Sequence, residues 1–165
     1  MIKTPSQTVG PYYAIGLCRA TENELVSQAD PSAIVLRGEL LDGDGVPIVD
    51  GMIEVWQPVE RRWGRCGTHA AEGRAGGEFS FVISKPEASA GQAPHLDIHV
   101  FARGLLKHQR TRLYFPDDPD ANAADPVLAA LAEVDRSRLI AALEDGGLRF
   151  DIHMQGPRET IFFVT

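Results

Sequence analysis

The chain has 165 residues, 44% of them hydrophobic, which is enough for one domain with a substantial apolar core. Its formal charge is −7 at pH 7 and it contains no basic run, which argues against a nucleic-acid groove or a surface for anionic membranes. No apolar stretch reaches membrane-spanning length, and the N-terminal residues carry no apolar signal core. We therefore expect a cytoplasmic protein in which the two distant cysteines, Cys18 and Cys66, are reduced and unpaired.

The first predicted element is an irregular N-terminal arm. Residues 4–17 read TPSQTVGPYYAIGL, which is uncharged, rich in turn-forming residues and only weakly periodic. Gly10-Pro11 is a turn signal, because a proline keeps the residue before it out of the helical region. The adjacent Tyr12 and Tyr13 are expected to pack, either on the chain's own domain or on a partner or pocket.

Seven short segments of alternating or β-branched residues then follow, separated by turn signals, and predict β-strands. They span residues 34–41, 52–57, 77–84, 95–100, 111–115, 148–155 and 159–164. Residues 60–77, rich in Arg and Gly, are expected to form an irregular loop. Asp125 as N-cap with Pro126 at the first helical position predicts a helix that continues to about residue 133, and a second short helix is expected over 137–143.

These elements predict a mainly β fold, an antiparallel β-sandwich with one or two short helices. The sandwich is expected to comprise residues 34–165, and residues 1–33 are expected to form an N-terminal strap on it. The whole chain is one domain in this prediction.

The stretch from residue 92 to residue 115 carries the strongest chemical pattern. His95, Asp97 and His99 alternate with three aliphatic residues, so the three metal-capable side chains share one face of a strand. Two such side chains on one strand are a common way to hold a metal, because they leave the same face about 7 Å apart. A solvated strand face is the plainer interpretation, and further ligands would have to decide between the two. A glycine-containing connection and a second strand complete a hairpin, with Arg103 near its bend.

Five motifs occur in an order that resembles the intradiol ring-cleavage dioxygenases, and among them the alpha-type subunits of protocatechuate 3,4-dioxygenases. They are TPSQTVGPYY at 4–13, IEVWQ at 53–57, GEFSF with the later KP at 77–86, APHLDIHVFARG at 93–104 and TRLYF at 111–115. The resemblance covers nearly the whole chain. Its most specific part is the TPSQT-x-GPY strap together with FARG and TRLYF.

In that family two homologous subunits pair, and the resemblance implies that only the beta subunit binds Fe(III), through two tyrosines and two histidines. The beta subunit's His-Ile-His strand matches Asp97-Ile98-His99, so an aspartate replaces one histidine and only His99 is kept. The resemblance therefore implies that this chain has no metal ligand and no catalytic residue of its own.

The tyrosines support the same implication. The family's two ligand tyrosines would lie in the loops on either side of the GEFSF strand, one of them after the KP motif. The tyrosines of this chain are Tyr12, Tyr13 and Tyr114, and none of them lies in either loop. The ferric mechanism relies on phenolate ligands, so this chain alone is expected to be inactive.

The resemblance also implies that this chain borders the substrate pocket of its partner. Carried over by position, the substrate-binding residues are Thr8, Gly10, Pro11 and Tyr12 from the strap and Arg103 from FARG. A guanidinium near the ring carboxylate of protocatechuate would favour binding and orientation, and a glycine lets the backbone approach an aromatic ring closely. An ion pair at the turn or at the subunit interface is the alternative for Arg103.

The implied assembly is a higher hetero-oligomer of alpha–beta protomers, in which the strap contacts the beta subunit. It would cleave protocatechuate with O2 to 3-carboxy-cis,cis-muconate at Fe(III) held by the beta subunit, and would involve neither nucleic acid nor membrane. The loops after residue 57 and after residue 86 are short for this family. Two alternatives to protocatechuate therefore stay open as the substrate: hydroxyquinol, or another catechol that carries a carboxylate.

Two other functions fit parts of the sequence. His95, Asp97 and His153 imitate the metal triad of Fe(II)/2-oxoglutarate oxygenases, with Arg158 as a candidate anchor for 2-oxoglutarate. Strand alternation alone, however, accounts for His153. The other alternative is a non-catalytic β-sandwich binding module derived from the family. The missing ligands and short loops favour that module, whereas the retained strap and Arg103 argue against it.

Overall fold

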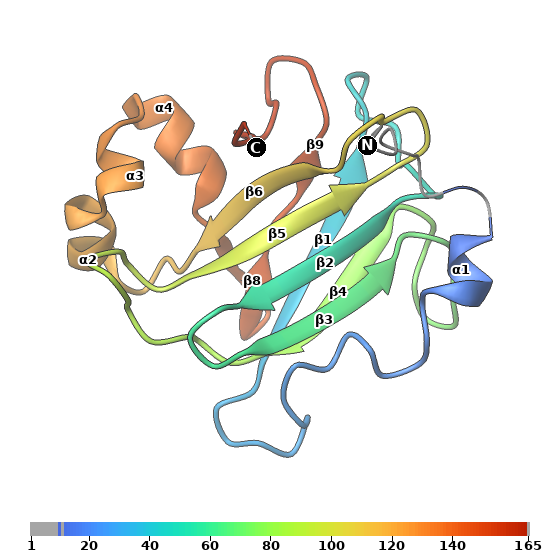
Figure 1. Ribbon diagram of the computed structural model, residues 1–165, viewed down its shortest axis with the longest axis horizontal. Coiled ribbons are helices and arrows are strands. Elements are labelled where there is room, and N and C mark those ends of the chain that lie inside the picture. The colour runs from blue at the N-terminus through green and yellow to red at the C-terminus, as the bar shows by residue number, and fades with distance from the viewer. Residues whose placement is uncertain (1–9, 11, 165) are drawn as a thin grey trace, which may run out of the picture.

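The computed structural model describes residue 10 and residues 12–164, and in this part of the chain nine strands form two facing sheets (Figure 1). The four-stranded sheet has the order β3-β2-β5-β6, with β2 at Met52–Gln57, β3 at Arg62–Gly67, β5 at His95–Phe101 and β6 at Gln109–Tyr114. The five-stranded sheet has the order β4-β1-β8-β7, and β9 also pairs with β1. Its strands are β1 at Ile34–Leu41, β4 at Glu78–Ile83, β7 at Ala142–Glu144, β8 at Gly147–Arg149 and β9 at Ile152–His153.

The predicted β-sandwich is confirmed, but its pairing is mixed at one strand. All neighbours in the four-stranded sheet are antiparallel, as are β1 with β4 and β7 with β8. The first strand β1 instead pairs in parallel with β8 and β9, which come from the far end of the chain. The sheet therefore joins segments that are distant in the sequence.

The core lies between the sheets and follows from strand alternation. On β5 the buried residues are Leu96, Ile98 and Val100, while the residues between them are only half-buried on the outer face. The same periodicity sends other apolar side chains inward, including Leu36, Leu40, Ile53, Val55, Phe79, Phe81 and Leu113. Each fully buried aliphatic or aromatic side chain of this size contributes about 1.5–3 kcal/mol from removal of apolar surface from water.

Gly38 is needed where the chain after β8 passes close to β1. A methyl group at this position would overlap the carbonyl oxygen of Phe150 and the ring of Phe79. Phe150 in turn donates its backbone N–H to the carbonyl of Arg37 at 2.8 Å. Glycine therefore permits a backbone approach that a side chain would block.

Short helices follow β6 and cover one end of the sandwich (Figure 1). They are α2 at Pro119–Ala124, α3 at Pro126–Ala129, α4 at Glu133–Arg136 and the 3-10 helix η1 at Ser137–Leu139; the remaining helix, α1 at Tyr13–Gly16, belongs to the arm. Asp125 is the N-cap of α3, as predicted, because its carboxylate accepts from two backbone N–H groups of the first turn. The helix ends at Ala129 rather than near residue 133. Among the described residues no helix is long and apolar enough to cross a membrane.

Three local predictions were wrong. Residues 60–77 are not all loop, because they contain β3, whose Arg- and Gly-rich sequence lacks alternation but gains its ladder from β2. The segment 137–143 forms only the short η1 and the start of β7. Residues 159–164 form no strand, because Thr160 donates to His153 in one sheet while Phe163 donates to Arg110 in the other.

Candidate functional site

The two adjacent tyrosines of the arm have opposite environments. Tyr13 is 3% exposed and packs its ring edge-on against His69, with 6.0 Å between ring centroids. Its hydroxyl donates to the carbonyl of Val49 at 3.4 Å, and burial raises its pKa. Tyr12 is 78% exposed. The arm is therefore held on its own domain by Tyr13, while the ring of Tyr12 is free to contact another molecule.

The predicted substrate-binding residues are only partly within the described part of the chain. Thr8 and Pro11 lie outside the described residues. Gly10 has a φ of +76°, in the left-handed region that favours glycine, and nothing lies within 4 Å of where its Cβ would be. Gly10 is half-buried, with open space beside its Cα, and lies two positions before the exposed Tyr12.

Arg103 follows β5, and its side chain is 82% exposed. Its Nε lies 3.1 Å from a carboxylate oxygen of Asp50, just before β2. Val49, the residue before Asp50, accepts the hydroxyl of Tyr13, so the arm and Arg103 lie at the same end of the molecule. An exposed ion pair of this kind adds little stability, about 0–1 kcal/mol. Asp50 was not predicted as a partner of Arg103, because the two residues flank neighbouring strands that are far apart in the sequence.

The outer face of β5 does carry His95, Asp97 and His99, as predicted, but Asp97 is already paired. Arg112 lies opposite it on β6 and donates its Nε to the Asp97 carboxylate at 3.1 Å. Both side chains are largely buried, with 14% and 23% of their surface exposed. Arg112 also donates to Gln92 and Tyr114, which fixes the guanidinium in place. The Asp97 carboxylate therefore serves an ion pair with Arg112.

His99 packs among rings rather than among ligands. Its imidazole stacks on His108 at 5.0 Å between centroids, and His108 stacks on Phe101 at 5.2 Å. Burial, with a smaller contribution from the charge of His108, lowers the pKa of His99. Its neighbour on β2, Glu54, is bound by Arg65. His99 is therefore a neutral ring in a half-buried stack at neutral pH.

The tyrosines do not complete a ferric site. The Tyr114 hydroxyl donates to Asp125 at 3.2 Å, and burial raises the pKa of Tyr114 to about 12, so it is a phenol at neutral pH. Tyr13 is packed on the β3–β4 connection through His69. Within the described residues, no three or more His, Cys, Asp or Glu side chains gather in a way that could hold a metal. The described residues therefore do not fit an Fe(III) centre of two tyrosinates and two histidines.

The triad of an Fe(II)/2-oxoglutarate oxygenase does not form either. His95 directs its Nδ1 to the carbonyl of Ala93 at 2.7 Å. Asp97 is held by its cross-strand arginine, and His153 lies on β9 in the opposite sheet. The alternative of an Fe(II)/2-oxoglutarate oxygenase was therefore wrong, because its three metal ligands do not come together.

The chain is similar to known proteins over almost its full length. No family model matches the chain. The alpha chains of protocatechuate 3,4-dioxygenase from Burkholderia cepacia and Pseudomonas putida are each 37% identical to it, over 98% of this chain and 96% of theirs. The chain belongs to the family of protocatechuate 3,4-dioxygenase alpha chains. The Burkholderia cepacia beta chain of the same name is also similar, at 31% identity over 74% of this alpha-type chain and 64% of the beta chain.

Solved structures show the same fold at low sequence identity. A dioxygenase domain from Streptomyces sp. SirexAA-E superposes with a TM-score of 0.59 at 20% identity, covering 93% of this alpha-type chain and 98% of that domain. An intradiol ring-cleavage dioxygenase from Tetranychus urticae gives a TM-score of 0.59 at 14% identity, covering 93% of each chain. Catechol 1,2-dioxygenase from Acinetobacter sp. ADP1 gives 0.52 at 14% identity, covering 79% and 55%. The predicted intradiol-type β-sandwich is thereby confirmed.

Proposed function

We propose that this alpha-type chain pairs with a homologous beta-type chain to form a protocatechuate 3,4-dioxygenase. The assembly would open the ring of protocatechuate with O2 to give 3-carboxy-cis,cis-muconate. The observation that carries the proposal is the 37% identity, over almost the full length, to two alpha chains of that name. The match to a beta chain supports a common ancestry of the two partners. We place the assembly in the cytoplasm, as a higher hetero-oligomer of alpha–beta protomers.

In this proposal Fe(III) belongs to the beta-type chain, and no step at the metal is assigned to a residue of this chain. The support comes from the positions that match the family's iron-ligand strand. Asp97 is neutralised by Arg112, and His99 is stacked on His108. Releasing Asp97 to bind a metal would leave a largely buried guanidinium without its counter-charge, which is costly.

The contribution of this chain is to bind and orient the substrate at the mouth of the partner's pocket. Arg103 presents an exposed guanidinium, and Asp50 restricts its position from one side through Nε. With 82% of its side chain exposed, Arg103 is accessible to a ring carboxylate, for which the planar fork of arginine is well matched. Gly10 and Tyr12, together with Thr8 and Pro11, would border the ring. The exposed ring of Tyr12 favours such a contact, because a large aromatic surface left in water is unfavourable.

The first experiment is co-expression with the homologous beta-type chain, followed by metal analysis and measurement of protocatechuate-dependent O2 uptake. We expect the complex to contain ferric iron and to consume O2, and the alpha-type chain alone to be iron-free and inert. Iron binding and turnover by this chain alone would overturn the assignment of the metal to the partner. A soluble monomer that never engages the beta-type chain would favour the non-catalytic module.

The second experiment tests Arg103 in the complex. Arg103→Ala is expected to raise KM for protocatechuate, and the fold-increase should be about ten times that for catechol. Catechol lacks the ring carboxylate, and a charge-assisted hydrogen bond to that group contributes about 1.5–3 kcal/mol. Arg61→Ala is the matched control, since Arg61 is exposed at the β2–β3 turn. Equal effects of Arg103→Ala on both substrates would contradict the carboxylate role.

A further inference from the structure

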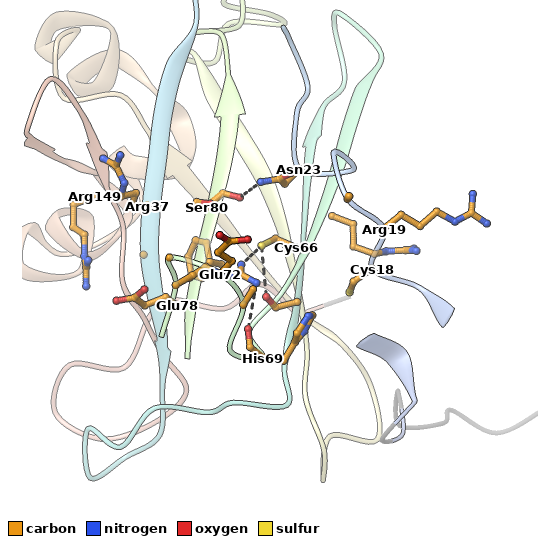
Figure 2. A pocket seen from close by; sticks show the side chains of 18 residues that line it. Cys18, Arg19, Asn23, Arg37, Cys66, His69, Glu72, Glu78, Ser80 and Arg149 are labelled. Carbon is orange, nitrogen blue, oxygen red and sulfur yellow. Dashed lines mark hydrogen bonds between the residues drawn. The ribbon is translucent and has the colours of Figure 1, made fainter. Parts of the chain in front are cut away.

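A cavity of about 470 Å³ lies at the edge of the sandwich where β3 and β4 face each other (Figure 2). Its lining comes from the segment that follows the arm, from β1, β3, β4 and β8, and from the β3–β4 connection. Neither Tyr12 nor Arg103 is among the described residues that line it. Its volume falls within the range of about 300–1,000 Å³ that is usual for small-molecule sites. The cavity is therefore a separate feature from the proposed substrate-binding residues.

The lining of this cavity is rich in positive charge. It includes five arginines and two glutamates: Arg19, Arg37, Arg65, Arg74, Arg149, Glu72 and Glu78. This concentration is notable in a chain that has 16 basic residues in all and a net charge of −7. Three of the arginines are neutralised by nearby carboxylates, namely Arg19, Arg65 and Arg149. Among the described residues, no carboxylate lies within ion-pair distance of the other two, Arg37 and Arg74.

Arg74 is the inner cation of the cavity. Its side chain is half-buried, with Nη1 at 2.5 Å from the thiol of Cys66 and Nη2 at 3.3 Å from the carbonyl of His69. A thiol is a weak acceptor and neither partner is a carboxylate, so among the described residues the half-buried guanidinium of Arg74 has no carboxylate counter-charge. An anion that entered the cavity would supply this counter-charge through charge-assisted hydrogen bonds.

The neighbouring histidine reports the same local potential. The Nδ1 of His69 is shielded from solvent and has no hydrogen-bond partner in the described structure. Burial, and then the positive charge of Arg74, lower the pKa of His69. The positive charge of Arg74 therefore acts on the cavity wall at His69.

Arg37 is the outer cation. It projects from β1, with Ser80 opposite it on β4 and Arg149 opposite it on β8, and all three line the cavity. Arg149 is already paired with Glu39 and Asp151, so among the described residues of this rim Arg37 is the arginine without a carboxylate partner. Arg37 is exposed, and no hydrogen bond of its side chain is described, so it can turn toward a ligand.

We propose that this cavity binds a small oxyanion of the phosphate, sulfate or carboxylate type, with Arg74 as its inner contact and Arg37 at its rim. The planar guanidinium group presents pairs of N–H donors that match two oxygens of one anion. The site would neutralise the two arginines that lack a carboxylate partner. An acidic side chain of another protein would satisfy the same charges, and the experiment distinguishes that case.

The test is calorimetric titration of the whole chain with inorganic phosphate, with sulfate and with acetate at low ionic strength, using chloride as the control for ionic strength. We expect saturable binding at one site, and the anion bound most tightly identifies the ligand as tetrahedral or as a carboxylate. Arg37→Gln should weaken binding about tenfold, since it removes one charge-assisted contact without disturbing a described side-chain contact. Arg74→Gln should weaken it further. Arg61→Gln removes the same charge outside the cavity and should leave binding unchanged.

The proposal is overturned by heats that do not saturate or that chloride reproduces, by unchanged binding in Arg37→Gln, or by an equal loss in Arg61→Gln. If Arg74→Gln fails to fold, the comparison of the Arg37 and Arg61 variants decides. The titration is repeated on the complex with the beta-type chain. Binding by the chain that disappears in the complex would mean that the partner covers the cavity, which also overturns an anion site in the assembly. The result for the chain alone is independent of whether the dioxygenase assembly forms.

Discussion

Asp125 connects three separate parts of the fold through one buried carboxylate, so its substitution tests how these parts are held together. The side chain is fully buried and its carboxylate accepts four hydrogen bonds. One oxygen accepts the backbone N–H of Val127 at 2.8 Å, that of Leu128 at 3.0 Å and the hydroxyl of Tyr114 at 3.2 Å. The other oxygen accepts the backbone N–H of Ala93 at 2.9 Å. Asp125 thus joins α3, β6 and the segment before β5.

The expected cost of Asp125→Ala follows from these contacts. Loss of the helix cap alone costs about 1 kcal/mol, and two further donors, on Ala93 and Tyr114, stay buried without an acceptor at about 1–3 kcal/mol each. Because water reaches part of the helix end and such terms are not additive, we expect a loss of about 3–5 kcal/mol in the free energy of unfolding. Asp125→Asn keeps one acceptor for the helix but turns an amide donor toward the N–H of Ala93. We expect it to lose about 1–3 kcal/mol.

Urea denaturation followed by tryptophan fluorescence measures these losses through the midpoint and the slope of unfolding. Asp120→Ala is the control, because Asp120 is exposed in α2 and should change the free energy of unfolding by less than about 0.5 kcal/mol. A loss below about 1 kcal/mol in Asp125→Ala would refute the four-bond description, given the size of the capping term alone. Equal losses in the alanine and asparagine variants would refute the separate roles assigned to the two oxygens.

Three further predictions concern packing, pH and the arm. Gly38→Ala should cost about 3 kcal/mol or more, because its methyl group would overlap a backbone carbonyl; a near-normal urea midpoint would show that the strands can separate. Burial lowers the pKa of His69, His99 and His153, so the native state binds fewer protons than the unfolded chain, and unfolding free energy should fall as pH drops below the unfolded value of about 6.5. Urea curves at several pH values measure this slope, which His99→Gln should flatten; an unaltered slope would exclude His99 as a contributor. Tyr12→Phe should leave the unfolding curve unchanged, since the ring is exposed, but alter turnover of the complex; unchanged kinetics would remove Tyr12 from the proposed site.

The sequence was most informative where structure depends on near neighbours. Alternation on residues 95–100 predicted both the buried stripe of β5 and its polar outer face, because a strand places successive side chains on opposite faces. The Asp125-Pro126 pair predicted the start of α3, because capping involves residues two and three positions away. Family motifs then supplied what periodicity could not, which was the intradiol type of the sandwich.

The predictions failed where structure depends on distant partners. The strand β3 has no alternation of its own and exists because β2 offers it a ladder. The pairing of Asp97 with Arg112 and of Arg103 with Asp50 decides what these side chains can do, yet each pair is set by register between strands or by the approach of loops. The arginine-lined cavity gathers residues from four strands and two connections, so no single stretch of sequence indicates it.

The mixed pairing of β1 has a consequence during synthesis of the protein. β1 lies between β4 on one side and β8 and β9 on the other, and the hydrogen bond from Glu39 to Asp151 spans 112 positions. At translation rates of about 5–20 residues per second, one edge of β1 stays without its partner strands for roughly 5–20 s after it is made. An open strand edge can pair with other chains in that interval, and long-range pairing is slow to form. The nascent chain therefore spends its most aggregation-prone period with the four-stranded sheet already translated and the five-stranded sheet still incomplete.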